Sequence, residues 1–170
     1  MKVNIGDYPE TDDPRQVSVV IEKFDIWNMN DTLALIILPM LKMLKEDKHG
    51  VPGNMKSLAY DSQSSWPQEC FAFYSEDDAD AFSAAVLEWE EILDKIIWSF
   101  EQIGIDWESQ YWEVAPEFDF DEYPEDEGKE LIPLRWKTEG ECDSAGLAAH
   151  GVRIQEGFDL FGKHYENFWS

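Results

Sequence analysis

Positive charge is scarce in this chain, so the places where it gathers are informative. One group comes at a spacing of three residues, followed at once by a histidine: Lys42, Lys45, Lys48 and His49. Such side chains attract anions, phosphate groups above all. Two interpretations remain open: pairing of the lysines with the negative end of a helix, or a local anion site. An anion site would also need the amides of a helix start, such as residues 30–32, and a ring that stacks a base, such as that of Trp27, Trp98 or Trp169.

Residues of the types used in catalysis are present, but they do not form a known catalytic motif. The sequence has no GxSxG, HExxH, GxGxxG or Walker-type GK[ST] motif. Glu90, Glu91 and Asp94 have the types that bind a metal, but their spacing favours the solvated face of a helix. The three histidines lack the spacing of zinc ligands. We therefore expect a protein that is not an enzyme and that holds no metal or cofactor.

The composition restricts the partners. A net charge of −24 repels long nucleic acids and anionic membranes, so it either keeps an aromatic-rich protein soluble or imitates the phosphates of DNA. Cys70 and Cys142 are too few for a disulfide framework and fit a reducing compartment. The longest apolar run, residues 33–41, is too short to cross a bilayer, and the first residues lack the apolar core of a signal peptide. We expect a cytoplasmic protein without a membrane span.

The chain length of 170 residues suits a single domain over residues 1–170. The stretches KVNI and QVSVVIEKF predict a hairpin, in which Val17, Val19 and Ile21 alternate as in a half-buried strand. A first helix is expected from a cap at Asn30 or Asp31 to about Asp47. Because residues 33–41 are apolar on every face, this helix is expected to be buried.

Two further helices are expected. The first starts near Ser75 and Asp78, ends at Gly104, and carries an apolar stripe of Phe82, Val86, Trp89, Leu93, Ile96, Phe100 and Ile103, with Trp98 off the stripe. The second runs from about Ser144 to Phe168. Between them, residues 106–130 form an acidic, aromatic-rich insertion or loop, and residues 131–136 a strand that returns to the hairpin. The prediction is a mainly α (α+β) fold: three long helices packed with a small N-terminal β-hairpin.

Three blocks of the sequence resemble a widespread family of small tailed-phage proteins. They are DIWNMNDTLALIILPMLKMLKEDKHGVP (25–52), WEEILDKIIWSFEQ (89–102) and GVRIQEGFDLFGKHYENFWS (151–170). The family looks like the anti-CBASS nucleotide sponges, which form tetramers and sequester cyclic dinucleotide signals of bacterial defence without performing chemistry. The resemblance implies a homo-oligomer in the cytoplasm of an infected bacterium, with a 3′3′-cGAMP-like ligand. Asn28, Asn30 and His164 stand where the family pattern has Ser, Asp and Tyr, which puts the ligand preference in doubt.

The resemblance also implies a set of ligand residues: Trp27, Thr32, Lys42, Lys45, His49, Arg153, Lys163 and Tyr165. Lys45, His49, Arg153 and Lys163 would hold phosphates, and Trp27 or Tyr165 would stack a base, although either ring is equally a core residue. The two ends of the first helix lie about 20 Å apart at 1.5 Å per residue. Either one end is structural, or the site is shared between subunits.

Three other functions remain as alternatives. The first is an acidic decoy that imitates DNA and inhibits a host DNA-binding protein through residues 106–130. The second is a virion or scaffold component, and the third is an enzyme. The aromatic residues in that segment fit a DNA mimic poorly, and the sequence motifs do not support the enzyme.

Overall fold

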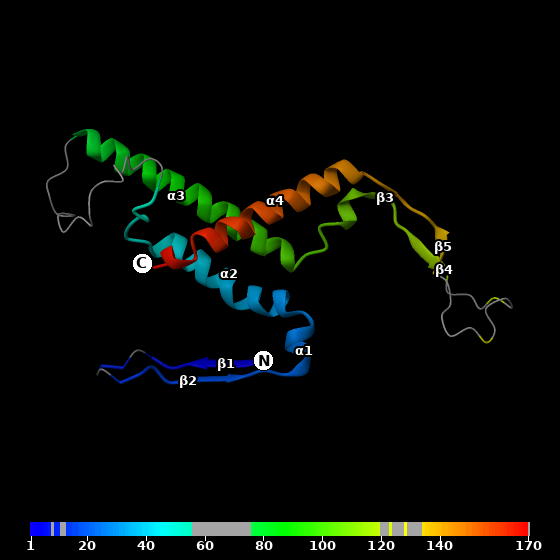
Figure 1. Cartoon of the computed structure of the whole chain (residues 1–170), viewed down its shortest axis with the longest axis horizontal. Helices are drawn as coiled ribbons and strands as arrows, with labels where there is room; N and C mark the ends of the chain where they lie inside the picture. Colours follow the sequence, from blue (N-terminus) through cyan, green and yellow to red (C-terminus); the bar gives the residue numbers. More distant parts are fainter. Residues whose placement is uncertain are drawn as a thin grey trace.

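Three long helices form the body of the molecule (Figure 1). The structure, a computed structural model, describes residues 1–7, 9–10, 13–55, 76–119, 123, 128 and 134–169, with backbone alone for 76–79. The long helices are α2 (Met29–Asp47), α3 (Glu76–Ile103) and α4 (Ser144–Lys163). Shorter helical turns are α1 (Lys23–Trp27), η1 (Ser109–Tyr111) and η3 (Tyr165–Asn167). The expected mainly α (α+β) fold is confirmed.

The strands of the described residues form three separate antiparallel pairs. These are β1 (Lys2–Ile5) with β2 (Val17–Val20), β3 (Trp112–Val114) with β6 (Glu141–Cys142), and β4 (Glu117–Asp119) with β5 (Arg135–Thr138). The expectation that residues 131–136 return to the N-terminal hairpin is wrong, because β5 pairs with β4, while residues 131–133 lie outside the described part. Cross-strand contacts favour the observed pairing: Phe118 stacks on Trp136 at 4.1 Å, and Lys137 Nζ lies 2.7 Å from Glu117 Oε1.

The predicted N-terminal hairpin is present, with Lys2 opposite Val20 and Ile5 opposite Val17. Its strands are not half-buried as expected, since Val17 is 60% exposed and Val19 51%. Figure 1 shows the hairpin beside the helices rather than packed on them. The hairpin is tied to α1 by the Met1 ammonium, which lies 2.8 Å from Asp25 Oδ1.

Helix α2 differs from its prediction at its start. Its N-cap is Asn28, not Asn30 or Asp31, and the Asn28 side chain makes no capping hydrogen bond. The reason is the short helix α1, which ends at Trp27 and delivers the chain directly into α2. The Thr32 amide then donates to the Asn28 carbonyl at 3.1 Å. The predicted end at Asp47 is confirmed.

The expectation that α2 is buried on all sides is wrong for the single chain. Only Ala34 and Leu41 of this helix are buried, whereas Leu35 is 79% exposed and Met40 66%. Within one chain α2 packs against α3 along one face, and its other apolar side chains face outward.

The core lies where α2 and α4 meet α3. The predicted α3 stripe is confirmed at its centre, where Trp89, Leu93, Ile96 and Phe100 are buried. Ser75 and the side chain of Asp78, which were expected to start this helix, lie outside the described residues. Figure 1 shows α4 crossing α3. Gly157 makes this crossing close, because a Cβ there would lie 2.6 Å from the Lys95 carbonyl oxygen.

Helix α4 begins at Ser144 as predicted but ends at Lys163, five residues earlier than expected. The chain then turns through η3 and returns Phe168 to the core. There the Phe168 ring stacks on Trp89 with centroids 6.1 Å apart. Ending the helix early thus lets one more aromatic ring join the core.

Candidate functional site

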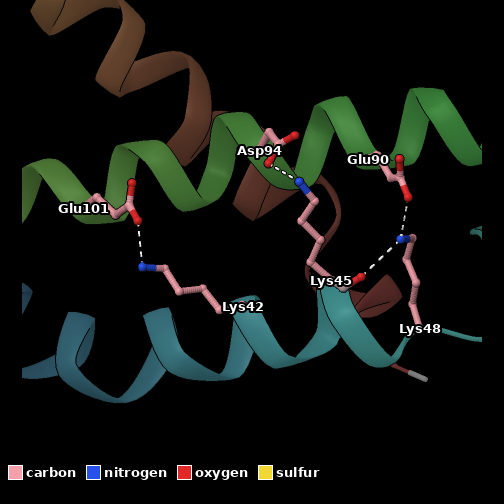
Figure 2. A network of polar contacts seen from close by, with 6 residues as sticks. All are labelled: Lys42, Lys45, Lys48, Glu90, Asp94 and Glu101. Carbon is pink, nitrogen blue, oxygen red and sulfur yellow. Dashed lines mark hydrogen bonds and ion pairs between the residues drawn. The ribbon is translucent and has the colours of Figure 1, made fainter.

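The lysines that the sequence singles out form a ladder of ion pairs between α2 and α3 (Figure 2). Lys42 Nζ lies 2.7 Å from Glu101 Oε1, and Lys48 Nζ lies 2.8 Å from Glu90 Oε1. Between them, Lys45 pairs with Asp94. We call these six residues the lysine ladder. Their spacing of three on α2 therefore matches acids on α3, which gives the lysines a structural role.

The ladder also explains acids that had the types of metal ligands. Glu90 and Asp94 are counterions of lysines. Across the described part of the chain, His, Cys, Asp and Glu form no group able to hold a metal ion. A phosphate that approached Lys42 or Lys45 would meet a carboxylate already in place, whose negative charge repels it. The ladder is thus a poor anion site in the single chain.

Arg153 has a different environment. Its guanidinium carbon lies 3.7 Å from the ring centroid of Trp98, a cation–π contact between α4 and α3. Arg153 is exposed, and Trp98 is half-buried. Trp98, which lies off the α3 stripe, therefore faces α4 as a second surface. Among the described residues, no ion pair involves Arg153.

Near Arg153, the imidazole of His150 makes one ring-stacking contact and two hydrogen bonds. Its ring stacks on Trp107 with centroids 4.4 Å apart and an interplanar angle of 11°. Its Nδ1 lies 2.9 Å from the Tyr111 hydroxyl, and its Nε2 lies 3.1 Å from Gln102 Oε1. Gln102 Nε2 donates to the Trp98 carbonyl at 3.1 Å, which leaves Oε1 as an acceptor. This geometry indicates the tautomer in which Nε2 donates to Gln102 and Nδ1 accepts from Tyr111.

Together these residues make one connected patch, which we call the aromatic cluster: Trp98, Gln102, Trp107, Tyr111, His150 and Arg153. The sequence singled out Trp98 and placed His150 and Arg153 on one face of the last helix, but it did not join them to Gln102, Trp107 and Tyr111. Gly146, in the first turn of α4, could have indicated the contact with Tyr111, because a Cβ at this position would lie 2.7 Å from the Tyr111 ring. A glycine inside a helix start indicates close approach of another element.

The other predicted ligand residues lie at two further places. Trp27 and Thr32 lie where α1 passes into α2, and Trp27 is 84% exposed. His49 follows the carboxyl end of α2. Lys163 is the last residue of α4, and Tyr165 follows it. Those two ends adjoin, since Asn167 Nδ2 donates to Asn54 Oδ1 at 3.4 Å.

One chain therefore does not unite the eight predicted residues in one site. Phe168, which follows Lys163 and Tyr165, packs on Trp89, whereas Arg153 packs on Trp98 of the same helix. Nine residues of helix separate these two contacts by about 14 Å.

A cavity of about 610 Å³ lies between α2 and α3. Leu38, Pro39 and Phe100 line its apolar part. Its charged lining residues are all acids: Asp31, Glu101 and Asp106. Negative charge at the rim disfavours a phosphate, so this cavity is not a candidate for the anion site.

His164 belongs to the core rather than to a ligand site. Its side chain is 1% exposed, and its ring centroid lies 5.4 Å from that of Trp89. Its Nε2 has no hydrogen-bond partner in the described part of the structure. Burial, reinforced by the charge of Lys163, lowers the pKa of His164 below its ordinary value of 6.5, although the carboxylate of Glu88 opposes this.

None of the helices that the structure describes is long and apolar enough to span a membrane. No family model, curated protein or solved structure matches this chain.

Proposed function

We propose that this chain is a non-enzymatic phage protein that evades bacterial immunity in the cytoplasm of the infected cell. It binds and sequesters cyclic oligonucleotide messengers of the 3′3′-cGAMP type, which blocks CBASS signalling. One observation carries the proposal: the exposed guanidinium of Arg153 lies on the ring of Trp98. This pair offers charge for a phosphate and a flat surface for a base, the two requirements of a nucleotide. The ligand class comes from the resemblance of the three sequence blocks.

Arg153 suits a phosphate better than the ladder lysines do. A guanidinium in contact with an aromatic ring can still donate its N–H groups to a phosphate. Within the described residues it has no carboxylate to give up, whereas Lys42 and Lys45 are paired with Glu101 and Asp94. Binding at Arg153 therefore breaks no ion pair among the residues that the structure describes.

The aromatic cluster also reduces the ordering cost of binding. Both nitrogens of His150 are hydrogen-bonded within the chain, and its ring is stacked on Trp107. Side chains held in this way lose little freedom when a ligand arrives. A base stacks on the outer face of the Arg153 guanidinium, which continues the stack begun by Trp98.

The same hydrogen bonds argue for sequestration over reaction. His150 is the imidazole of the cluster, and Tyr111 and Gln102 already occupy its two nitrogens. It is therefore not arranged as a general base toward a ligand. The proposal accordingly assigns binding and no chemical step to the cluster.

The test is calorimetry of the purified chain with a panel of cyclic di- and trinucleotides, followed by recovery of the ligand. One class is expected to bind and to be recovered unchanged. At a ligand concentration of 100 times the dissociation constant, the free energy of unfolding should rise by about 2.7 kcal/mol. Absence of binding across the panel would refute the proposal, and recovery of a converted nucleotide would point to an enzyme instead.

The residue assignment is tested with a matched pair of variants. Arg153→Ala is expected to weaken binding about tenfold or more, which corresponds to about 1.4 kcal/mol. Arg135→Ala is the control, because the Arg135 guanidinium lies 4.4 Å from the Tyr123 ring and so makes the same kind of contact outside the cluster. Equal affinities of the two variants would show that Arg153 is not a ligand residue.

A further inference from the structure

Helix α2 carries a second apolar face, which we call the α2 seam. It consists of five residues at a spacing of four, three, four and three: Met29, Leu33, Ile36, Met40 and Met43. Met40 is 66% exposed and Met43 64%, while Ile36 at the centre is half-buried. This spacing places the five side chains in one line along the helix.

The α2 seam is distinct from the face that packs on α3. Ala34 and Leu41 are buried on the α3 side, and Lys48 reaches across to Glu90 from the same side. At about 100° per residue, the centre of the seam lies about 120° around the helix from this buried face. Helix α3 therefore accounts for only one of the two apolar faces of α2.

The seam is also uncharged in a strongly acidic chain. None of its five positions carries a charge, although the chain has 37 acidic residues. Helix α1, which leads directly into α2, adds Phe24, 86% exposed, and Trp27, 84% exposed. A helix that is apolar all round is a helix buried all round, and an exposed patch of this kind marks an interface.

We propose that the α2 seam packs against the α2 seam of a second copy of this chain about a two-fold axis. Alternating steps of four and three are the pattern by which side chains of two helices interdigitate. A two-fold contact brings a surface onto itself, so an acid near the axis would face its own copy. An uncharged seam avoids that repulsion despite the net charge of −24.

The available area is sufficient for a stable pair. The exposed side chains of the seam, together with Phe24 and Trp27 of α1, offer roughly 800 Å², which is about the area that a standard interface buries on each partner. In such an assembly Trp27 contributes to the subunit contact rather than to base stacking. This inference does not depend on the proposed ligand, because it uses none of the aromatic cluster.

Sedimentation velocity of the full chain tests the pairing. The wild-type chain is expected to be assembled, and the double variant Leu33→Glu/Met40→Glu to sediment as a monomer with an unchanged helical circular dichroism spectrum. Leu87→Glu, at a 62% exposed leucine of α3, is the matched control and should stay assembled. A monomeric wild type would mean that something other than a second copy covers the seam, and an assembled double variant would place the interface elsewhere; either result overturns the proposal.

A crosslink adds a test that introduces no charge. Ile36 is the middle of the seam, so it faces its own copy whether the two helices run parallel or antiparallel. In a background of Cys70→Ser and Cys142→Ser, Ile36→Cys is expected to give a disulfide-linked dimer on mild oxidation, and Leu87→Cys is not. Absence of the Ile36→Cys dimer in a folded sample, or equal yields for both variants, would also overturn the proposal.

Discussion

Two regions of the molecule differ in the burial of their apolar side chains. One is the crossing of α3 and α4, and the other is formed by α1 and α2. At the crossing, Trp89 and Ile96 are buried, and Gly157 lets the helices approach closely. In α1 and α2, Phe24 and Met40 are mostly exposed. Among the described residues, the crossing is covered within one chain, whereas the α1–α2 region leaves large apolar side chains exposed. The first region therefore stabilises the fold of the single chain, and the second is the surface that the proposed pairing would cover.

The largest expected effect comes from filling the crossing. Gly157→Leu is expected to lower the free energy of unfolding by about 3 kcal/mol, because overpacking a close contact forces the helices apart. Even its Cβ would lie 2.6 Å from both the Lys95 carbonyl oxygen and Ser99 Cβ. Urea denaturation followed by circular dichroism measures the loss.

The control for this prediction lies on the same helix. Among the residues that the structure describes, no heavy atom lies within 4 Å of a Cβ placed on Gly162. Gly162→Ala is therefore expected to leave the stability unchanged or to raise it by up to about 1 kcal/mol, since alanine favours a helix over glycine. Equal losses in both variants would show that the crossing is no tighter than the exposed end of α4.

The helices of the crossing could be predicted from the sequence, because each is encoded by a local pattern of residues. The repeat of apolar residues predicts α3, Gly104 lies directly after its end, and α4 begins at Ser144 as expected. The exposure of α2 could not be predicted in this way. Its composition shows that every face is apolar, but not which face is covered by the same chain and which by another.

The candidate site was less predictable than the fold for the same reason. The spacing of Lys42, Lys45 and Lys48 is visible in the sequence, but their pairing with acids of α3 depends on how the two helices pack. Likewise, Trp98 and Arg153 are 55 positions apart, and only the helix crossing brings them together. Pairs of this kind follow from tertiary packing, which no local pattern records.

The buried side chain of His164 is expected to make the stability of the core depend on pH. The pKa of His164 is lowered by burial, so in the pH range just below 6.5 the unfolded chain binds a proton that the folded chain does not. Stability is then retained above pH 6.5 and falls as the pH drops below it, by at most about 1.4 kcal/mol per pH unit. Urea denaturation across this range should show the extra loss in the wild type and not in His164→Gln. Parallel pH profiles would show that His164 does not contribute.

The lysine ladder is expected to give a smaller effect that is graded by burial. The Lys48 side chain is 12% exposed and that of Lys42 is 48% exposed. Lys48→Met is expected to cost up to about 1 kcal/mol and Lys42→Met less than about 0.5 kcal/mol, because exposed ion pairs contribute little. Denaturation at low and high salt measures both. A larger loss for Lys42→Met would mean that burial does not set the strength of the ladder.

The smallest expected effect is the most direct test of the contrast between the two regions. If the α2 seam is covered only by a second copy, Met40→Gln should change the stability of the monomer by no more than about 0.5 kcal/mol. The measurement is urea denaturation at a dilution where sedimentation shows single chains. The same substitution should weaken assembly at higher concentration, since a polar amide then enters an apolar contact. A loss of about 2 kcal/mol in the monomer would instead show that Met40 is buried within its own chain, and the two regions would no longer differ in kind.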